Sequence, residues 1–416
     1  MNMLGNVFSN IKPRLDDLGT DRLNYFYSTI VILGMALTIT ARQFVGSPLQ
    51  CWVPAFFSRA WEAYAENYCF VYNTYWTKPN EDLPSTIEER VQNQLIYYQW
   101  APFIMAIEAG FFYIPVVIWG QLSGYSGMNV TKLVETAQKA ESASDTDRAK
   151  HVEVICKHIS NHSRPRPAVE RRYFGCKIKK LDQIRRVVFK HGTALRNAYV
   201  LTKFIYMLNL FLQFYSTNKF LGQNDPWWGA HVVNDLVSGN NWEETGNFPR
   251  IAMCDFQVRE LGQQHRYSIQ CVLSLNMFNE KIFLFLYWWF AIVLVITFID
   301  TYKLIRNVWT EEGRIEFIRE FLQKDLELNL VDKFSAKRNQ ELRQLMQYFC
   351  SVRLSPDIIM LLKMINGHTS EIVCCEIVMR LWTEYIEAIT SGRLLISSES
   401  EEGDPNEKEI APFAIS

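Results

Sequence analysis

The chain lacks the common sequence signatures of catalytic chemistry. It contains no glycine-rich phosphate-binding loop and no Gly-x-Ser-x-Gly nucleophile elbow. Its only group of metal-ligand type has a spacing that fits no standard zinc pattern: His151, Cys156, His158 and His162. We therefore expect no enzyme activity, no bound metal and no other cofactor.

A surplus of charge of one sign is also missing, because 43 basic residues stand against 44 acidic ones. No nucleic acid is expected as a partner. The sequence lacks the inverted repeat and broken-helix pair that hold a transporter substrate. Residues Met1 to Asp21 lack the apolar core of a cleavable signal peptide, so the first apolar run is expected to act as its own insertion signal.

What the sequence does contain is four long apolar runs. They cover Tyr25 to Val45, Ala101 to Leu122, Ala198 to Tyr215 and Ile282 to Tyr302. Each approaches the length of about 20 residues that a helix needs to cross a membrane. The third run is the weakest, because Lys203 interrupts it. Buried helices of a soluble protein are the alternative, but the flanking residues follow the membrane rules, so we predict four membrane spans.

The placement of lysine and arginine predicts the orientation of these spans. Basic residues concentrate directly before the third run: Lys177, Lys179, Lys180, Arg185, Arg186 and Lys190. More of them precede the first run and follow the fourth. The loop from Arg42 to Ile96 has four basic residues against six carboxylates. By the positive-inside rule, both termini and the middle loop are expected in the cytoplasm.

The two predicted outer loops each carry two cysteines. Cys51 and Cys69 lie in the first loop, and Cys254 and Cys271 lie in the second. Because disulfides persist outside the cell and are rare in the cytosol, these four should be paired and the other five cysteines reduced. Four cysteines allow three connectivities, and the spacing does not choose among them. Four free buried thiols are the alternative.

Together these patterns predict an all-α membrane protein with four transmembrane helices, two disulfide-tied extracellular loops and a helical cytoplasmic domain. The middle loop and the C-terminal tail would form that domain. The predicted segments are a cytoplasmic N-terminal segment (1–23), span one (24–45), outer loop one (46–97), span two (98–122), a cytoplasmic loop (123–195), span three (196–216), outer loop two (217–280), span four (281–303), a helical C-terminal region (304–396) and a flexible acidic tail (397–416).

Several motifs carry a family resemblance. The second span opens with Tyr97, Tyr98, Gln99, Trp100, Ala101 and Pro102, and the run Phe112-Tyr113-Ile114-Pro115 follows. Cys51-Trp52-Val53-Pro54, Phe248-Pro249-Arg250, Cys254-Asp255-Phe256 and Asn276-Met277-Phe278-Asn279-Glu280-Lys281 complete the set. This ordered set, which covers about residues 21–300, resembles the innexins, the invertebrate gap-junction proteins that are related to the pannexins.

The resemblance implies a gap-junction channel subunit at the plasma membrane. Eight copies would form a ring, two rings in adjacent cells would dock head to head, and mixed rings with other innexin subunits are an alternative to rings of one chain. Ions and small solutes would then pass from cell to cell through the central pore, and membrane lipid would surround each ring. It also implies that Cys51 pairs with Cys271 and Cys69 with Cys254. An undocked hemichannel and a non-conducting adhesion or scaffold protein are the alternatives.

A short helix is expected in the first outer loop. Aromatic residues recur at helical spacing after Pro54, namely Phe57, Trp61, Tyr64 and Tyr68. We expect these rings to pack against the second outer loop. Glu62 and Glu66 lie one turn apart on another side, where they would face water. If that water is the pore vestibule, they would favour cations; a merely solvated face is the alternative.

Two residues of the second span are candidates for a special role. Glu108 lies among apolar neighbours, and an ionisable group at membrane depth is expected to face the bundle interior, water or a partner such as Lys203. Our hypothesis is that Glu108 adds pH sensitivity; a protonated or solvated side chain is the alternative. Pro115 should loosen the helix, and a packing feature is favoured over a gating hinge.

The N-terminal residues are expected to form a short amphipathic helix. Met3, Leu4, Val7, Phe8 and Ile11 recur at helical spacing after Met1 and Asn2. The resemblance implies that this helix lines a pore funnel, although a helix on the membrane surface is the alternative. Asp16 and Asp17 would add negative potential near the entrance. For Asp21, capping of the first transmembrane helix is the favoured interpretation.

Similar spacing predicts helices in the C-terminal region. Apolar residues recur at three- and four-residue intervals in two groups: Ile315, Ile318, Phe321 and Leu322, and Leu342, Leu345, Met346 and Phe349.

Overall fold

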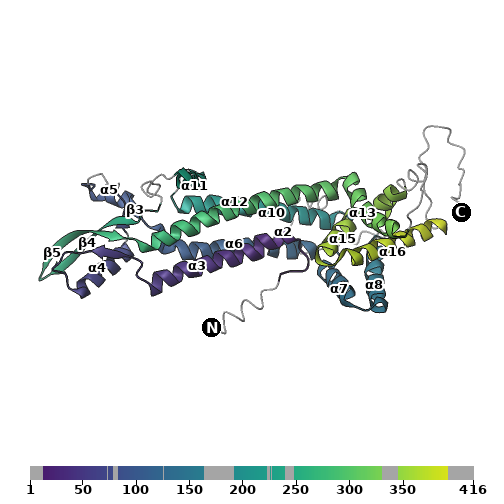
Figure 1. The fold of residues 1–416 in the computed structure, drawn as a ribbon, viewed down its shortest axis with the longest axis horizontal. Coiled ribbons are helices and arrows are strands. Elements are labelled where there is room, and N and C mark those ends of the chain that lie inside the picture. Colours follow the sequence, from purple (N-terminus) through teal and green to yellow (C-terminus); the bar gives the residue numbers. More distant parts are fainter. Residues whose placement is uncertain are drawn as a thin grey trace, which may run out of the picture. The chain divides into compact units, whose positions relative to one another are not determined.

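The computed structural model describes residues 13–72, 74–77, 83–124, 126–163, 192–222, 225, 227–238, 248–329 and 345–391 (Figure 1). The chain divides into two compact units. Unit 1 comprises Met1–Gly19, Trp119–Leu201 and Thr301–Ser416, and unit 2 comprises Thr20–Ile118 and Thr202–Asp300. Each unit is therefore built from segments that are far apart in the sequence.

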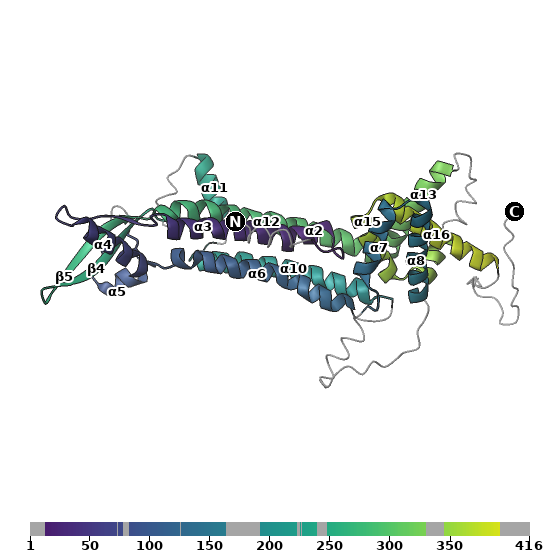
Figure 2. The same ribbon diagram turned by 90° about the horizontal axis from the view of Figure 1, so that it is seen from below.

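Unit 2 holds most of the length of the long helices. The helical elements that lie wholly or mainly in it are α2 (Gly19–Arg22), the π-helical turn η1 (Leu23–Tyr27), α3 (Ser28–Val45), α4 (Arg59–Tyr72), α5 (Ile87–Gln92), α6 (Tyr97–Gly124), α10 (Ala194–Phe220), α11 (Trp228–Ser238) and α12 (Ser274–Trp309). Helices α3, α6, α10 and α12 run alongside one another in both views (Figures 1 and 2). Helices α6, α10 and α12 extend beyond the predicted spans at both ends, whereas α3 ends with its predicted span at Val45.

Three helical segments are long and apolar enough to cross a membrane: Gly19–Val45, Tyr97–Gly124 and Ser274–Trp309. Only 28%, 44% and 33% of the residues in their most apolar windows are buried, so each helix exposes an apolar face as contact with lipid requires. Among the described residues, α10 does not reach the same hydropathy, because Lys203 and several polar side chains interrupt it.

The prediction of an all-α protein is wrong for the outer segments, because unit 2 also contains a five-stranded antiparallel sheet. The strands are β1 (Gln50–Trp52), β2 (Thr74–Tyr75), β3 (Gln94–Leu95), β4 (Ile251–Glu260) and β5 (Gln263–Val272), in the order β1-β5-β4-β2-β3. Ala252, Cys254 and Phe256 are buried at alternate positions of β4, as a sheet with one buried face requires.

A tight turn joins β4 and β5 into a hairpin. Leu261 and Gly262 both have positive φ angles, 48° and 86°, which is the requirement of the two-residue turn that matches the strand twist. The Leu261 side chain at this turn is fully exposed. Glu260 and Gln263, the residues on either side of the turn, are the last pair of the ladder.

Unit 1 is a helical domain with its own core. Its described elements include α7 (Val130–Ser142), α8 (Asp145–Ser163), α13 (Glu311–Asn329), the π-helical turn η3 (Phe349–Arg353), α15 (Pro356–His368) and α16 (Glu371–Thr390). Ile318, Phe321 and Leu322 are buried in the core of this unit, as their spacing predicts. Met346 and Phe349 are buried there too, whereas Leu342 and the predicted acidic tail lie outside the described residues.

Candidate functional site

Two disulfides fasten the sheet of unit 2. Cys51 of β1 is bonded to Cys271 of β5, and Cys69 of α4 is bonded to Cys254 of β4. These are the pairs that the family resemblance implies. Since the bonds connect positions 220 and 185 residues apart, they lock the segment after α3 onto the segment before α12.

Helix α4 places its aromatic side chains against the β4–β5 hairpin. It begins at Arg59 rather than at Pro54, because Pro54 to Phe57 forms a turn in which Phe57 N donates to the Pro54 carbonyl at 3.0 Å. The Phe57 ring lies edge-on to Tyr267 at 5.3 Å between centroids. The ring centroids of Tyr68 and Phe256 lie 6.0 Å apart. The expected packing between the two outer segments is therefore present.

The two glutamates of α4 differ in their surroundings. Glu62 is exposed on the first turn of the helix. Glu66 is half-buried, and its Oε1 accepts a hydrogen bond from the backbone N of Cys51 at 3.3 Å. The expectation that both carboxylates face water is thus correct for Glu62 only. A role of either residue in a pore vestibule stays a prediction.

Asp255 is the centre of a polar cluster that the sequence did not single out. Its carboxylate accepts hydrogen bonds from Arg90 Nη1 at 2.6 Å, from Arg266 Nη2 at 3.0 Å and from Ser268 Oγ at 2.6 Å. Burial acts to raise the pKa of Asp255, but the hydrogen bonds from Ser268 and the two arginines outweigh burial and hold it below its ordinary value. The cluster ties α5 to strands β4 and β5.

The tyrosine-rich motif at the start of α6 connects that helix to the end of α4. Tyr98 is fully buried and donates to the Phe70 carbonyl at 3.4 Å. Gln99 Nε2 donates to the same carbonyl. Trp100, by contrast, is 56% exposed, at the end of an apolar helix where tryptophan favours the membrane surface. The rest of the motif comprises Tyr97, which is buried beside Phe248, and Pro102, which lies inside α6.

Glu108 is buried in the bundle, but its partner is not Lys203. Its Oε1 accepts a hydrogen bond from the Thr217 hydroxyl of α10 at 2.7 Å. Its Oε2 has no hydrogen-bond partner in the described part of the chain. Pro115 lies seven residues further along the same helix, which is continuous from Tyr97 to Gly124.

Lys203 instead joins two aspartates of other helices, Asp21 of α2 and Asp300 of α12. Its Nζ lies 2.8 Å from Asp21 Oδ1 and 2.6 Å from Asp300 Oδ2. The side chains of Lys203 and Asp21 are almost wholly buried, whereas Asp300 is 30% exposed. The capping role expected for Asp21 is therefore wrong, because Asp21 lies inside α2 and its carboxylate pairs with Lys203.

Two further aspartates precede α2 and belong to unit 1. Asp16 pairs with Arg14 at 2.8 Å, and Asp17 Oδ1 lies 3.3 Å from His368 Nε2 at the end of α15. Both carboxylates are buried. Their contribution to a negative pore entrance stays a prediction that this burial weighs against. The other funnel candidates, Met1, Asn2, Met3 and Leu4, lie outside the described residues.

A third buried carboxylate of unit 1 caps a long helix. Asp357 of α15 is fully buried and accepts a hydrogen bond from the backbone N of Arg196, in the first turn of α10, at 3.0 Å. Burial raises the pKa of Asp357 to about 6, although the hydrogen bonds from the backbone of Arg196, Ala194 and Leu195 act in the opposite direction.

These features define a helical membrane protein in which a disulfide-bonded sheet joins the ends of apolar helices. The sequence pattern of the family described as Innexin matches residues 16–385. The chain is 58% identical to innexin eat-5 of Caenorhabditis elegans over 93% of this chain and 91% of that protein. It is 36% identical to innexin unc-9 and 35% identical to innexin-12 of the same organism, over 91% and 94% of this chain and 94% and 93% of the relatives. The chain therefore belongs to the innexin family, a family of gap-junction channel proteins.

Proposed function

We propose that this chain is the subunit of a gap-junction channel in which rings of subunits from two adjacent cells dock and pass ions and small solutes. Membership of the innexin family over residues 16–385 is the observation that carries the proposal. The disulfide-bonded sheet of unit 2 supports it, because docking two rings requires a surface whose shape is fixed before contact. The ring of eight, mixed rings with other innexins and the gap-junction location rest on the family.

In this proposal α10 also crosses the membrane, as the third of four spans in chain order. Its apolar side chains Phe204, Leu208 and Phe211 are 49%, 57% and 60% exposed. Its polar side chains face inward, since Lys203 and Thr217 are buried. A helix with an apolar outside and a polar inside is suited to lipid, even though its average hydropathy is lower than that of the other three spans.

The same proposal places unit 1 and both termini in the cytoplasm and the sheet of unit 2 outside the cell. The cysteines support this orientation, because every described cysteine of unit 2 is disulfide-bonded and every described cysteine of unit 1 is in the thiol form. Burial raises the pKa of the Cys156 and Cys350 thiols to about 12, so these thiols are poor nucleophiles.

Paired-cell recording tests the function directly. Two cells that both express the chain are clamped separately, and junctional current between them is compared with membrane current in single cells. Junctional current supports docking and conduction together. Current in single cells without junctional current identifies an undocked hemichannel. Silence in both, with the protein at the cell surface, contradicts conduction by this chain alone and favours a scaffold or an obligate partner subunit.

A further inference from the structure

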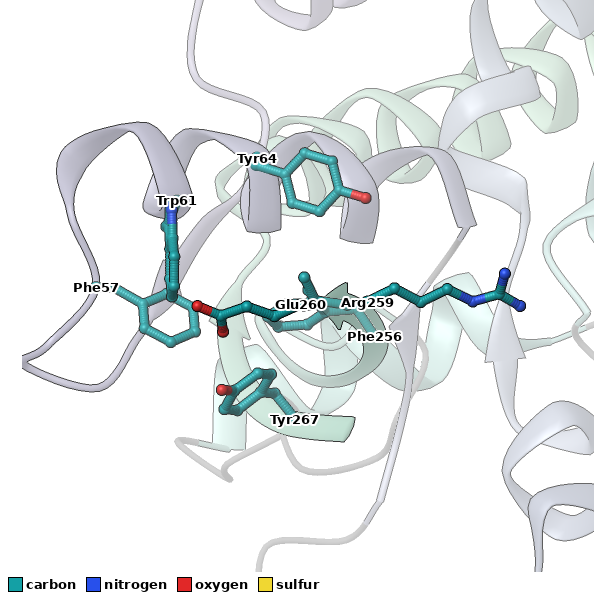
Figure 3. Close-up of a pocket in the computed structure, with 8 residues that line it drawn as sticks. Phe57, Trp61, Tyr64, Phe256, Arg259, Glu260 and Tyr267 are labelled. Atoms are coloured by element: carbon teal, nitrogen blue, oxygen red, sulfur yellow. The ribbon is translucent and has the colours of Figure 1, made fainter. Parts of the chain in front are cut away.

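A cavity of about 400 Å³ lies in unit 2 between α4 and the β4–β5 hairpin (Figure 3). Its volume falls within the range of small-molecule sites, which is about 300–1,000 Å³. The eight lining residues are Phe57, Trp61, Tyr64, Phe256, Val258, Arg259, Glu260 and Tyr267. Docking needs no such hollow, so the cavity calls for an explanation of its own.

Aromatic rings form most of the cavity wall. Phe57 meets Trp61 edge to face, with ring centroids 5.4 Å apart, and Tyr267 stacks on Phe256 at the same separation. Trp61 and Tyr64 remain 43% and 53% exposed, so their rings have free surface. Because the face of an aromatic ring carries negative electrostatic potential, several such rings around one space attract a cation.

The positions of the charged side chains at the cavity also favour a positively charged ligand. In Figure 3 the Glu260 carboxylate lies among Phe57, Trp61 and Tyr267, whereas the Arg259 guanidinium points away from the rings. A carboxylate beside the rings repels anions and adds to the attraction of a cation. A hard inorganic cation such as Ca²⁺ takes about 6–8 oxygen ligands, whereas the lining side chains offer only one carboxylate and two tyrosine hydroxyls, which disfavours such an ion.

We propose that this cavity binds a small organic cation whose nitrogen carries apolar substituents, such as a substituted ammonium ion. The substituents contact the aromatic walls while the positive charge lies near Glu260. The site is on the face of unit 2 that we assign to the extracellular side, so its ligand comes from outside the cell. The inference goes beyond channel function, because neither conduction nor docking requires it.

Isothermal titration of the full-length protein in lipid nanodiscs tests the proposal with two probes of equal shape. Choline carries the charge, and 3,3-dimethylbutan-1-ol replaces its nitrogen with carbon. We expect saturable binding of choline that is about tenfold tighter than that of the alcohol, as a cation–π site of moderate strength predicts. Equal binding of the two probes, or no saturable binding of choline, would overturn the proposal.

Matched variants locate the site. Trp61→Ala and the milder Trp61→Phe should weaken choline binding in that order, and Glu260→Gln should weaken it several-fold. The control Glu88→Gln, the same exchange at an exposed carboxylate of α5 that does not line the cavity, should leave binding unchanged. Choline binding that none of the first three variants alters would lie elsewhere and contradict the proposal. Binding to detergent-dispersed single chains but not to assembled rings would also contradict it, because another copy of the chain would then fill the cavity.

Discussion

Glu108 is a carboxyl group in an apolar helix, with a neutral hydroxyl as its hydrogen-bond partner. Glu108→Gln keeps the oxygen that accepts from Thr217 and removes the group that titrates. We therefore expect the variant to assemble normally and to show a weaker response of junctional conductance to cytoplasmic pH. Conductance recorded in cell pairs between about pH 6 and 8 checks this, with the exposed Glu62→Gln as control. An unchanged pH response would remove the hypothesis that Glu108 is a pH sensor.

Asp357 makes the folding stability of unit 1 depend on pH, with a sign that follows from its raised pKa. Its pKa of about 6 in the folded protein lies above the ordinary value of 3.8, so folding favours the protonated form. The resulting stability is fully present below pH 3.8 and is lost as the pH rises through 6, by about 3 kcal/mol at most.

Hydrogen exchange at the first turn of α10 measures this effect. After correction for intrinsic rates, protection should increase as the pH falls from 7 to 5, and the Asp357→Asn variant should lack that increase. Glu376→Gln, a variant in a partly exposed ion pair of unit 1, is the matched control. Equal pH dependence in the wild type and Asp357→Asn would show that another group titrates.

At the scale of elements, Lys203 links the first, third and fourth apolar helices. Lys203→Met leaves Asp21 buried without a cation, and removal of one partner of a buried pair costs about 3–5 kcal/mol. The double variant Lys203→Met with Asp21→Asn should recover much of that loss. Thermal denaturation of the purified protein compares them. If the double variant is no more stable than the single one, the pair does not supply the stability.

The tip of the β4–β5 hairpin carries a leucine side chain that is not buried within the described part of the chain. Leu261 is fully exposed, and its positive φ angle costs about 1–2 kcal/mol that asparagine avoids in part. We expect Leu261→Asn to keep the hairpin and single-cell currents but to reduce junctional conductance, because a docking contact is lost. Val237→Asn, at another exposed apolar position of an outer segment, is the control. Undiminished coupling would exclude the tip from docking.

The helices were predictable, whereas the sheet and the ionic partners were not. A span needs a long apolar run, and that signal is local in the sequence. β1 pairs with β5 across more than 200 residues, and β2 and β3 have two residues each, so no local pattern marks them. The partners of Lys203 left a weak signal in the sequence. Asp21 precedes the first apolar run, Lys203 lies near the start of the third, and Asp300 lies near the end of the fourth. In the predicted topology these three positions are on the same side of the membrane, so an ion pair among them could have been predicted.

At the scale of the whole molecule, the disulfides fix the surface that we assign to docking. Cys51→Ser should abolish junctional conductance, because β1 then loses its covalent link to β5 and docking requires that surface to keep its shape. Paired-cell recording, with surface labelling to show that the variant reaches the membrane, is the measurement. Cys375→Ser, at a partly exposed thiol of unit 1 that is in neither disulfide, should leave coupling intact. Full coupling by Cys51→Ser would mean that docking does not depend on this bond.

The order of the cysteines along the chain also constrains biogenesis. Cys51 emerges from the ribosome 220 residues before its partner Cys271, an interval of roughly 10–45 s at the usual rate of synthesis. In the proposed orientation, Cys51 and Cys69 are for most of that interval two thiols in an oxidising compartment before either partner, Cys254 or Cys271, has been made. A cell that makes this protein must therefore delay or repair oxidation of the first loop, and its yield of correctly bonded subunits should depend on disulfide isomerase.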